Sequence, residues 1–381
     1  MGIKIYMLPA KSGDCFLLET DKKRILIDGG YHSTYHNELK SLLVSTSNPE
    51  IDLLIVTHID RDHIEGVIEL LKDKMPIKQI WFNSYEHLPK KVASHGLNDD
   101  EVDILREYTM PQIQHEGIWE HDVSAVQGET LSELITQNQV KWNTSVQGKA
   151  ICIENIRSMC LNTNTKIVLI SPTEYQLSNL AQAWINELKR KKWTFVATND
   201  VRFGGAMEAF FLSSITTSDV QEREISYNPK LSIPELAEQT ASPDKSITNA
   251  SSISVLIDRM GKKLLFLADG AEEQIIPALD DLRTNYFDVI KLSHHGSLKN
   301  ATKLFDNIDG EYFLISTNGI QHDHPHIATI AKIISRPSKI TRKILFNYAH
   351  DVYKYYNNES LMSKYNYSVF LTSSTDPIII A

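Results

Sequence analysis

The chain has 381 residues, of which 42% are hydrophobic, and this is enough apolar material for a complete core. Its 39 basic and 48 acidic residues give a formal net charge of −9, which excludes a protein that binds nucleic acid through a wholly basic surface. The three cysteines do not have Cys-x-x-Cys spacing, and no window approaches the roughly 20 apolar residues that span a bilayer, so we expect a soluble protein of the reducing cytoplasm.

The N-terminal part of the chain predicts a tight α/β arrangement. Apolar runs between turn signals are expected to be strands, at residues 4–8, 15–18, 24–27, 51–56 and 77–82. Helices are expected at 39–44 and at 64–71, where apolar residues share one face. The run at 51–56 is largely apolar, which is typical of a strand buried on both faces, and it ends in Thr57-His58.

The middle of the chain is less regular. Residues 86–165 are rich in Gln, Glu, Asn and His, with helical patches at 100–106 and 131–134. A strand is expected at 166–170, ending in Ser171, and a long helix at 174–192. Residues 194–248 have no clear periodicity and many Ser, Thr, Asn and Pro residues, so we expect them to be rich in loops.

Regular patterning returns in the C-terminal third. Strands are expected at 253–257, 263–267, 287–292, 312–316, 343–346 and 367–371, and helices at 271–282 and 327–334. Polar residues again follow apolar strands, with Asp269 after the second of these strands and His294-His295 after the third.

The segment from Thr57 to Gly66 carries the clearest metal-binding pattern. It reads Thr-His-Ile-Asp-Arg-Asp-His-Ile-Glu-Gly, and its candidate ligands are His58, Asp60, Asp62 and His63. Neutral imidazole and carboxylate suit zinc or manganese. In a turning loop the alternate positions share one side, and Gly66 allows the following helix to approach closely. Each residue alone would usually be a helix cap or a satisfied polar group, but the combined spacing predicts a metal site.

Two further clusters depend on this first one for their interpretation. Paired histidines such as His294-His295 are most often surface residues, and a lone Asp such as Asp269 before a helix is usually a cap. Both stand at strand ends, as the first cluster does. We therefore expect all three clusters to meet.

Together these segments resemble the metallo-β-lactamase superfamily, whose motif is His-x-His-x-Asp-His. Asp60 replaces the second His, and this form resembles the metallo-hydrolase domain of the competence protein ComEC and its relatives. The segments 13–18, 25–30, 249–252, 264–269, 288–297 and 324–325 also resemble that group, with Ala268 and Asp323 where it has Gly. The resemblance implies an α/β fold, the metallo-β-lactamase αββα sandwich, as a single domain over 1–381 with an insertion region at 86–245.

The resemblance also implies two divalent metal ions, zinc first and manganese as the alternative. Many members add a His from a central strand end, but the equivalent here is Ser171, a poor zinc ligand. The ligand set closes if both His294 and His295 bind metal. One ion would take His58, Asp60 and one of this pair, the other would take Asp62, His63 and the other of the pair, and Asp269 would bridge. Which of the two histidines serves which ion stays open, and Asp28 is expected to hold a ligand His from behind.

Other polar residues receive roles of their own from this interpretation. Two ions roughly 3.5–4 Å apart would activate a shared water, which Asp62 or Asp60 would orient. His324 would bind a phosphate oxygen or protonate the leaving group, or it is only a turn residue before Pro325. Ser297 and Lys299 are weaker candidates for substrate contact. Surface positions are expected for His32, His36, His322 and His326.

The ComEC-like motifs favour a nuclease or phosphodiesterase that acts on DNA or RNA. The basic run at 189–192 beside Trp193 would suit a nucleic-acid strand, although a solvated helix end is the more common explanation of such a run. The alternatives are a hydrolase of small phosphoesters or lactones and an interaction module with a structural or regulatory metal. We also expect residues 194–245 to cover the site until a regulatory protein partner displaces or cleaves them.

Overall fold

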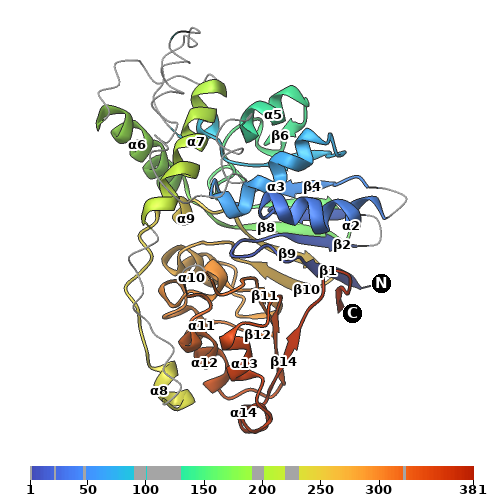
Figure 1. The fold of residues 1–381 in the computed structure, drawn as a ribbon, viewed down its shortest axis with the longest axis vertical. Coiled ribbons are helices and arrows are strands. Elements are labelled where there is room, and N and C mark those ends of the chain that lie inside the picture. The colour runs from blue at the N-terminus through green and yellow to red at the C-terminus, as the bar shows by residue number, and fades with distance from the viewer. Residues whose placement is uncertain are drawn as a thin grey trace, which may run out of the picture.

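The computed structural model describes residues 2–20, 23–45, 49–89, 100, 130–190, 201–218, 231–320 and 323–381. Two β-sheets pack face to face at its centre, and helices cover both outer faces (Figure 1). The expected αββα sandwich is therefore confirmed. In the described part of the chain, no helix is both long enough and apolar enough to cross a membrane.

The first sheet has seven strands in the order β15-β1-β2-β3-β4-β5-β6. These are β1 (Ile3–Met7), β2 (Phe16–Glu19), β3 (Arg24–Ile27), β4 (Leu53–Ile55), β5 (Gln79–Trp81), β6 (Lys141–Trp142) and β15 (Ile378–Ile380). Because β15 pairs antiparallel with β1, the two chain ends lie close together (Figure 1).

The second sheet has eight strands in the order β14-β13-β12-β11-β10-β9-β8-β7. These are β7 (Ser158–Asn162), β8 (Thr165–Ser171), β9 (Ser254–Arg259), β10 (Lys262–Phe266), β11 (Tyr286–Lys291), β12 (Asp309–Ile315), β13 (Arg342–Phe346) and β14 (Tyr367–Leu371). Strands β10 to β14 are parallel to one another, so their carboxyl ends meet at one edge of the sheet.

The helices divide between the two outer faces. The first set is α1 (His32–Thr34), the π-helical turn η1 (Tyr35–Leu39), α2 (Lys40–Val44), α3 (Arg61–Lys72), α5 (Leu131–Gln137), α6 (Glu174–Arg190) and α7 (Val201–Ser218). The second set is α8 (Ile233–Ala237), α10 (Glu272–Asp281), α11 (Leu304–Asn307), α12 (Ile327–Ser335), α13 (Asp351–Tyr356) and α14 (Glu359–Tyr365). The short helix α9 (Ile247–Ala250) lies against α6. Short 3-10 turns are η2 (Tyr85–His87), η3 (Thr144–Val146), η4 (Ser293–Gly296) and η5 (Leu298–Asn300).

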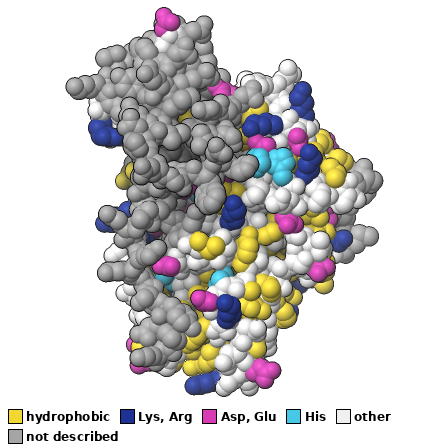
Figure 2. All heavy atoms as spheres, viewed as in Figure 1, with side chains coloured by type: hydrophobic (Ala, Val, Ile, Leu, Met, Phe, Trp, Pro, Cys, Tyr) yellow, Lys and Arg dark blue, Asp and Glu magenta, His cyan; other side chains and the backbone are white. Residues whose placement is uncertain are grey.

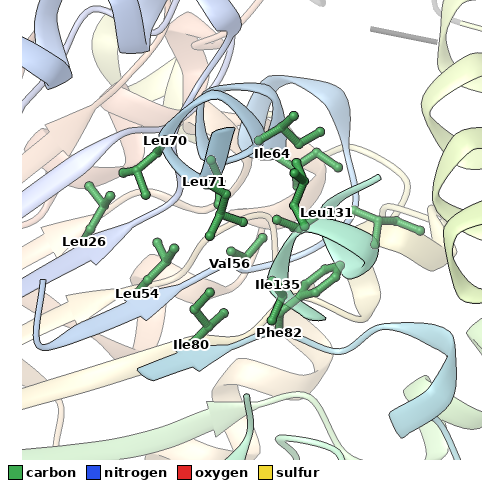
Figure 3. Close-up of a cluster of buried hydrophobic side chains, with 14 of the residues drawn as sticks. Leu26, Leu54, Val56, Ile64, Leu70, Leu71, Ile80, Phe82, Leu131 and Ile135 are labelled. Atoms are coloured by element: carbon green, nitrogen blue, oxygen red, sulfur yellow. The ribbon is translucent and has the colours of Figure 1, made fainter. Parts of the chain in front are cut away.

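Three hydrophobic cores follow from these layers. One fills the space between the sheets, where Phe16 and Phe266 meet edge to face. A second joins the first sheet to its helices, and Figure 3 shows α3 and α5 side chains such as Leu71 and Ile135 packed on strand residues such as Leu54. A third joins the second sheet to α10, α11, α12 and α13. The apolar helix face at 64–71 and the buried strand at 51–56 are thereby confirmed.

The middle of the chain departs from expectation. The stretch 194–248, expected to be rich in loops, contains the 18-residue helix α7 as well as α8 and α9. Helix α7 forms because Phe203 and Met207, four residues apart, are both buried in the second core listed above, against Tyr85 and Trp184 among others. The helical patch expected at 100–106 lies outside the described residues, apart from residue 100. Strands β6 to β8 of the expected insertion 86–245 belong to the sheets, and the domain boundaries stay a prediction.

Helix α7 also carries a buried carboxyl group. Glu208 is fully buried, and it accepts a hydrogen bond from the Ser132 backbone N–H (3.3 Å) and another from the Ser132 hydroxyl at the start of α5. Burial raises the pKa of Glu208 from 4.5 to about 8. No compensating cation is among the causes of this shift, so the folded protein retains a proton that the unfolded chain releases.

This proton makes stability depend on pH. Because the pKa is raised on folding, the contribution of Glu208 is fully present below pH 4.5 and is lost as pH rises through 8. Between these values the free energy of unfolding should fall by up to about 1.4 kcal/mol per pH unit. We expect Glu208→Gln to flatten this slope in urea unfolding at several pH values. An unchanged slope, with Glu238→Gln as the exposed control at the end of α8, would contradict the protonated state.

Candidate metal centre

The loop between β4 and α3 carries the predicted motif. His58 and His63 are buried, and Asp60 is the extended residue directly before α3. Two glycines allow neighbouring chain segments to approach this loop. A Cβ atom on Gly13 would lie 1.9 Å from the Asp62 carbonyl oxygen, and one on Gly66 would lie 2.0 Å from that of Gly29. The expected role of Gly66 in close helix packing is confirmed.

The other two clusters come from the edge where the parallel strands β10 and β11 end. Asp269 follows β10, and His294 and His295 follow β11. Both histidines have left-handed backbone conformations, with φ of 44° and 54°. This turn, held by a hydrogen bond from the His294 N–H to the Ala268 carbonyl (2.9 Å), keeps both rings near Asp269.

Asp269 lies at the centre of the assembled site. One of its oxygens, Oδ2, is within 4 Å of the Nε2 atoms of four histidines that come from two distant parts of the chain. The distances are 3.9 Å to His58, 3.7 Å to His63, 3.9 Å to His294 and 3.6 Å to His295. The three sequence clusters therefore meet, as expected from their positions at strand ends.

Each of these histidines is held from behind through its other ring nitrogen. The Nδ1–H group of His63 donates to Asp28 Oδ2 at 2.8 Å, and that of His295 donates to the Ser316 carbonyl at 2.7 Å. His294 Nδ1 lies 3.1 Å from Asp244 Oδ2. His58 Nδ1 lies 2.9 Å from the Thr57 hydroxyl, which itself donates to Asp28 Oδ2. A proton on Nδ1 leaves Nε2 as a free lone pair, the form in which imidazole binds a metal.

Several lone pairs at the centre lack hydrogen-bond partners among the described residues. Buried atoms without one include Nε2 of His58, His63 and His295, and Oδ1 of Asp60 and Asp269. Unpaired buried polar atoms cost free energy, and a converging set of them is typical of a metal site. The donor set of imidazole and carboxylate fits zinc or manganese.

The two motif carboxylates lie on different sides of this centre. Asp60 Oδ2 is 3.5 Å from His58 Nε2, whereas Asp62 Oδ1 is 3.8 Å from His63 Nε2. Asp62, His63 and His295 each offer a ligand atom within 4.8 Å of one another, and so do His58, His63 and Asp269. His295 is thereby grouped with Asp62 and His63.

The charges at the centre reinforce one another. Burial alone would raise the pKa of Asp269, but His295, His63 and His294 lower it well below its usual range. Burial alone would lower the pKa of His294, but Asp269 and Asp244 raise it to about 9. Asp269 therefore stays ionised and attracts positive charge, which a proton on His294 supplies when no cation is bound.

Three contributors were not assigned a role from the sequence. Asp14 is buried against Lys291, with which it forms an ion pair, and its Oδ1 lies 3.4 Å from His295 Nδ1. Burial raises the pKa of Asp14, but Lys291 and His295 lower it to about 2. Both residues stand in segments that resemble the family, which is the signal that could have identified them. Asp244 lies in the irregular region and had no such signal.

Three residues with predicted catalytic or substrate-binding roles remain, and their positions differ. His324 is buried, and its ring centroid lies 4.7 Å from that of His294, so it is beside the centre. Ser297 is fully buried, and its hydroxyl has no hydrogen-bond partner among the described residues. Lys299 is half-buried on η5.

Three further polar positions complete the comparison with expectation. Ser171 donates to the Ser252 carbonyl (2.8 Å) and is not one of the converging donors. The surface expectation was wrong for His326, which is buried and accepts the Leu298 N–H because η5 packs on it. His322 lies outside the described residues.

A family model and two curated proteins match parts of this chain. The model of the metallo-beta-lactamase superfamily matches residues 8–138. Two curated relatives, both named exodeoxyribonuclease WalJ, from Streptococcus pneumoniae serotype 2 strain D39 and from strain R6, are 36% identical over 70 residues. That match covers 18% of this chain and 25% of each relative.

Two solved structures are similar over the whole chain at low identity. The metallo-beta-lactamase fold protein YhfI from Bacillus subtilis aligns with a TM-score of 0.38 and 9% identity, covering 100% of this chain and 99% of that one. Zn(2+)-bound PqqB from Methylobacterium extorquens aligns with a TM-score of 0.39 and 9% identity, covering 100% of both chains.

A strained residue beside the centre gives a stability test. Ala268 has a φ of 47°, a conformation that costs an L-residue about 1–2 kcal/mol and glycine very little. After the entropy that a glycine loses on folding, we expect Ala268→Gly to raise the free energy of unfolding by about 0.5–1 kcal/mol. The control Ala183→Gly in α6 should instead lower it by about 1 kcal/mol. Denaturant unfolding of both variants is the measurement, and equal losses would contradict the strain.

The residue behind His63 gives a metal-affinity test. Asp28 accepts hydrogen bonds from His63 Nδ1, the Thr57 N–H and the Thr57 hydroxyl. Asp28→Asn should weaken metal binding about 10–100-fold, because the ring loses its orienting carboxylate. The control Asp52→Asn removes a buried carboxylate bound to Lys23 and Lys78 and should leave metal affinity unchanged. Competition with a chelator measures both, and equal affinities would rule out this role of Asp28.

Proposed function

We propose that this chain, which matches the model of the metallo-β-lactamase superfamily over residues 8–138, is a dinuclear metal-dependent phosphodiesterase that cleaves DNA or RNA. The observation that carries this proposal is the convergence of four histidine Nε2 atoms on Asp269 Oδ2 at 3.6–3.9 Å. Metal-dependent hydrolysis is the chemistry that such a donor set suits, because it leaves positions open for water and substrate.

We assign the ligands from the grouping of their atoms. One ion would be held by His58, Asp60 and His294, and the other by Asp62, His63 and His295, with Asp269 between them. The pairing of Asp60 with His58 and of His295 with Asp62 and His63 supports this division. Zinc is the first candidate, and manganese is the alternative that the carboxylates also suit.

When bound, two divalent ions lower the pKa of a shared water and polarise the phosphodiester. The side chain of Asp62 is 21% exposed, so it would face both the bound ions and the solvent, where it could orient the attacking water. His324 lies beside His294 and can donate a proton to the leaving oxygen. Lys291 balances the charge of Asp14 and keeps that buried carboxylate ionised.

The proposal of a nucleic-acid substrate rests on local features, because the chain as a whole is acidic. The partial likeness to an exodeoxyribonuclease supports it. On the face shown in Figure 2, Lys and Arg side chains are interspersed with Asp and Glu. Lys11 Nζ lies 5.1 Å from the centroid of the Tyr31 ring. Lys11 is two residues before Gly13, which packs against Asp62. A cation beside an aromatic ring can hold a phosphate and stack a base. Of the basic run at 189–193, residues 191–193 lie outside the described residues.

Substrate assays test this function directly. Protein loaded with zinc or manganese should cleave single- or double-stranded DNA or RNA, and Asp62→Ala should lower the rate by at least about 100-fold. Asp288→Asn, a carboxylate on β11 that bonds the Lys263 N–H, is the control and should keep the rate. Cleavage of small phosphodiesters or lactones alone would favour the small-molecule alternative. One bound ion or none would favour an interaction module.

We further propose that residues 194–245 restrain the enzyme until a regulatory protein partner acts on them. Asp244, near the end of this region, contacts His294 Nδ1 at 3.1 Å, so the region reaches the centre itself. Limited proteolysis within 194–245 should therefore change the cleavage rate while the metal content stays constant. An unchanged rate after complete cleavage would exclude the restraint.

A further inference from the structure

A second group of metal-binding side chains lies outside the catalytic centre. It consists of His32 in α1, His36 in η1 and Glu69 in α3. Glu69 follows His63 by six residues, which places it about 9 Å further along the helix axis. Both histidines are accessible, with side-chain exposures of 60% and 38%, whereas Glu69 is only 16% exposed.

The two histidines face one carboxylate oxygen. They are four residues apart, so they lie on the same side of their helical segment, and their ring centroids are 4.4 Å apart. His36 Nε2 lies 3.1 Å and His32 Nε2 lies 3.6 Å from Glu69 Oε2. In a tetrahedral zinc site with bonds of 2.0–2.1 Å, neighbouring ligand atoms are about 3.3–3.4 Å apart. The observed separations lie on either side of this value.

The surrounding contacts keep Glu69 available as an anionic ligand. Lys72 Nζ bonds the other oxygen, Oε1, at 2.8 Å, so Oε2 is left to the histidines. Burial raises the pKa of Glu69, but the hydrogen bonds from Lys72 and His36 lower it below its usual range. A carboxylate and two imidazoles make up three protein ligands, which leaves room for a water on an accessible ion.

We propose that His32, His36 and Glu69 form a third metal site, separate from the catalytic pair, that takes a zinc-like divalent transition-metal ion. The ion would join the turn at 32–36 to α3. The same helix carries Asp62 and His63 in its first turn, and the His32 N–H already bonds Glu65 Oε2 at 3.3 Å. Metal binding on the surface would therefore stiffen the helix that supplies ligands to the catalytic centre. It would not take part in the reaction.

A simple ion pair is the competing explanation, and the two explanations predict different responses to metal. If a protonated His36 only pairs with Glu69, the cluster binds no ion at neutral pH. If the cluster is a metal site, each chain should bind one equivalent of Co²⁺ beyond those at the catalytic centre, with the absorption bands of a low-symmetry site. Wild-type full-length protein and the variants His36→Gln and Glu69→Gln are to be titrated with Co²⁺ and Zn²⁺ by absorption and calorimetry.

We expect each of these variants to lose one equivalent of metal and the accompanying rise in unfolding temperature. Glu38→Gln, a carboxylate change in the same turn, should keep the wild-type stoichiometry. Lys72→Gln should also keep the wild-type stoichiometry, because Lys72 bonds Oε1 and the histidines face Oε2. Equal metal content in wild type and His36→Gln would overturn the third site.

The catalytic centre can be tested separately in the same experiment. Asp62→Ala should lose metal from the catalytic pair and keep the equivalent that depends on His36. A wild-type chain that binds a single ion, lost in His36→Gln, would contradict the dinuclear centre and leave the third site standing. If the bound ions are lost only in Asp62→Ala, the third site is contradicted and the dinuclear centre stands.

Discussion

The carboxylate of Asp269 is the group on which the rest of the centre depends. It is 3% exposed, it faces four imidazole Nε2 atoms and it lies 3.8 Å from Lys291 Nζ through its other oxygen. A carboxylate in such surroundings is stable only while positive charge stands opposite it. The fold supplies Lys291 and Asp14 as a fixed ion pair beside it and leaves the remaining charge to be balanced at the histidines. In the metal-free protein, protons on His63 and His294 supply this positive charge, and divalent cations would supply it more strongly.

The geometry needed for this convergence is costly for the backbone. Asp28, Ala268, His294 and His295 all have positive φ, and all lie at the ends of strands that lead into the centre. Residues other than glycine rarely adopt this conformation, and strain of this kind persists where the surrounding packing fixes it. Here the two-sheet core fixes the strand ends, so burial of apolar side chains stabilises the strained turns that direct the ligands.

The sequence predicted those parts of the molecule in which local pattern and tertiary structure agree. The strand at 24–27 and the buried strand before His58 were found because apolar runs end at turn residues. The meeting of Asp269 with His58 and His63 was predictable because Asp269 and His58 follow strands and His63 stands in the helix that begins shortly after His58. Helix α7 was missed because its apolar residues, Phe203 and Met207, are explained only by partners far away in sequence. Asp244 was missed for the same reason, since a lone Asp in an irregular stretch gives no local signal.

The surface cluster of His32, His36 and Glu69 shows the same limit of sequence-based prediction. His32 and His36 were interpreted as surface residues, and their exposure agrees with this, yet the third member, Glu69, comes from a helix that sequence reading treats separately. The packing of Gly29 against Gly66 and the hydrogen bond from the His32 N–H to Glu65 bring the turn at 32–36 against α3. That contact also connects the β3 end, with Asp28, to the helix that carries His63. One close backbone approach therefore positions both Asp28, which orients His63, and the proposed third site. For this reason we expect metal bound at the surface to stabilise α3.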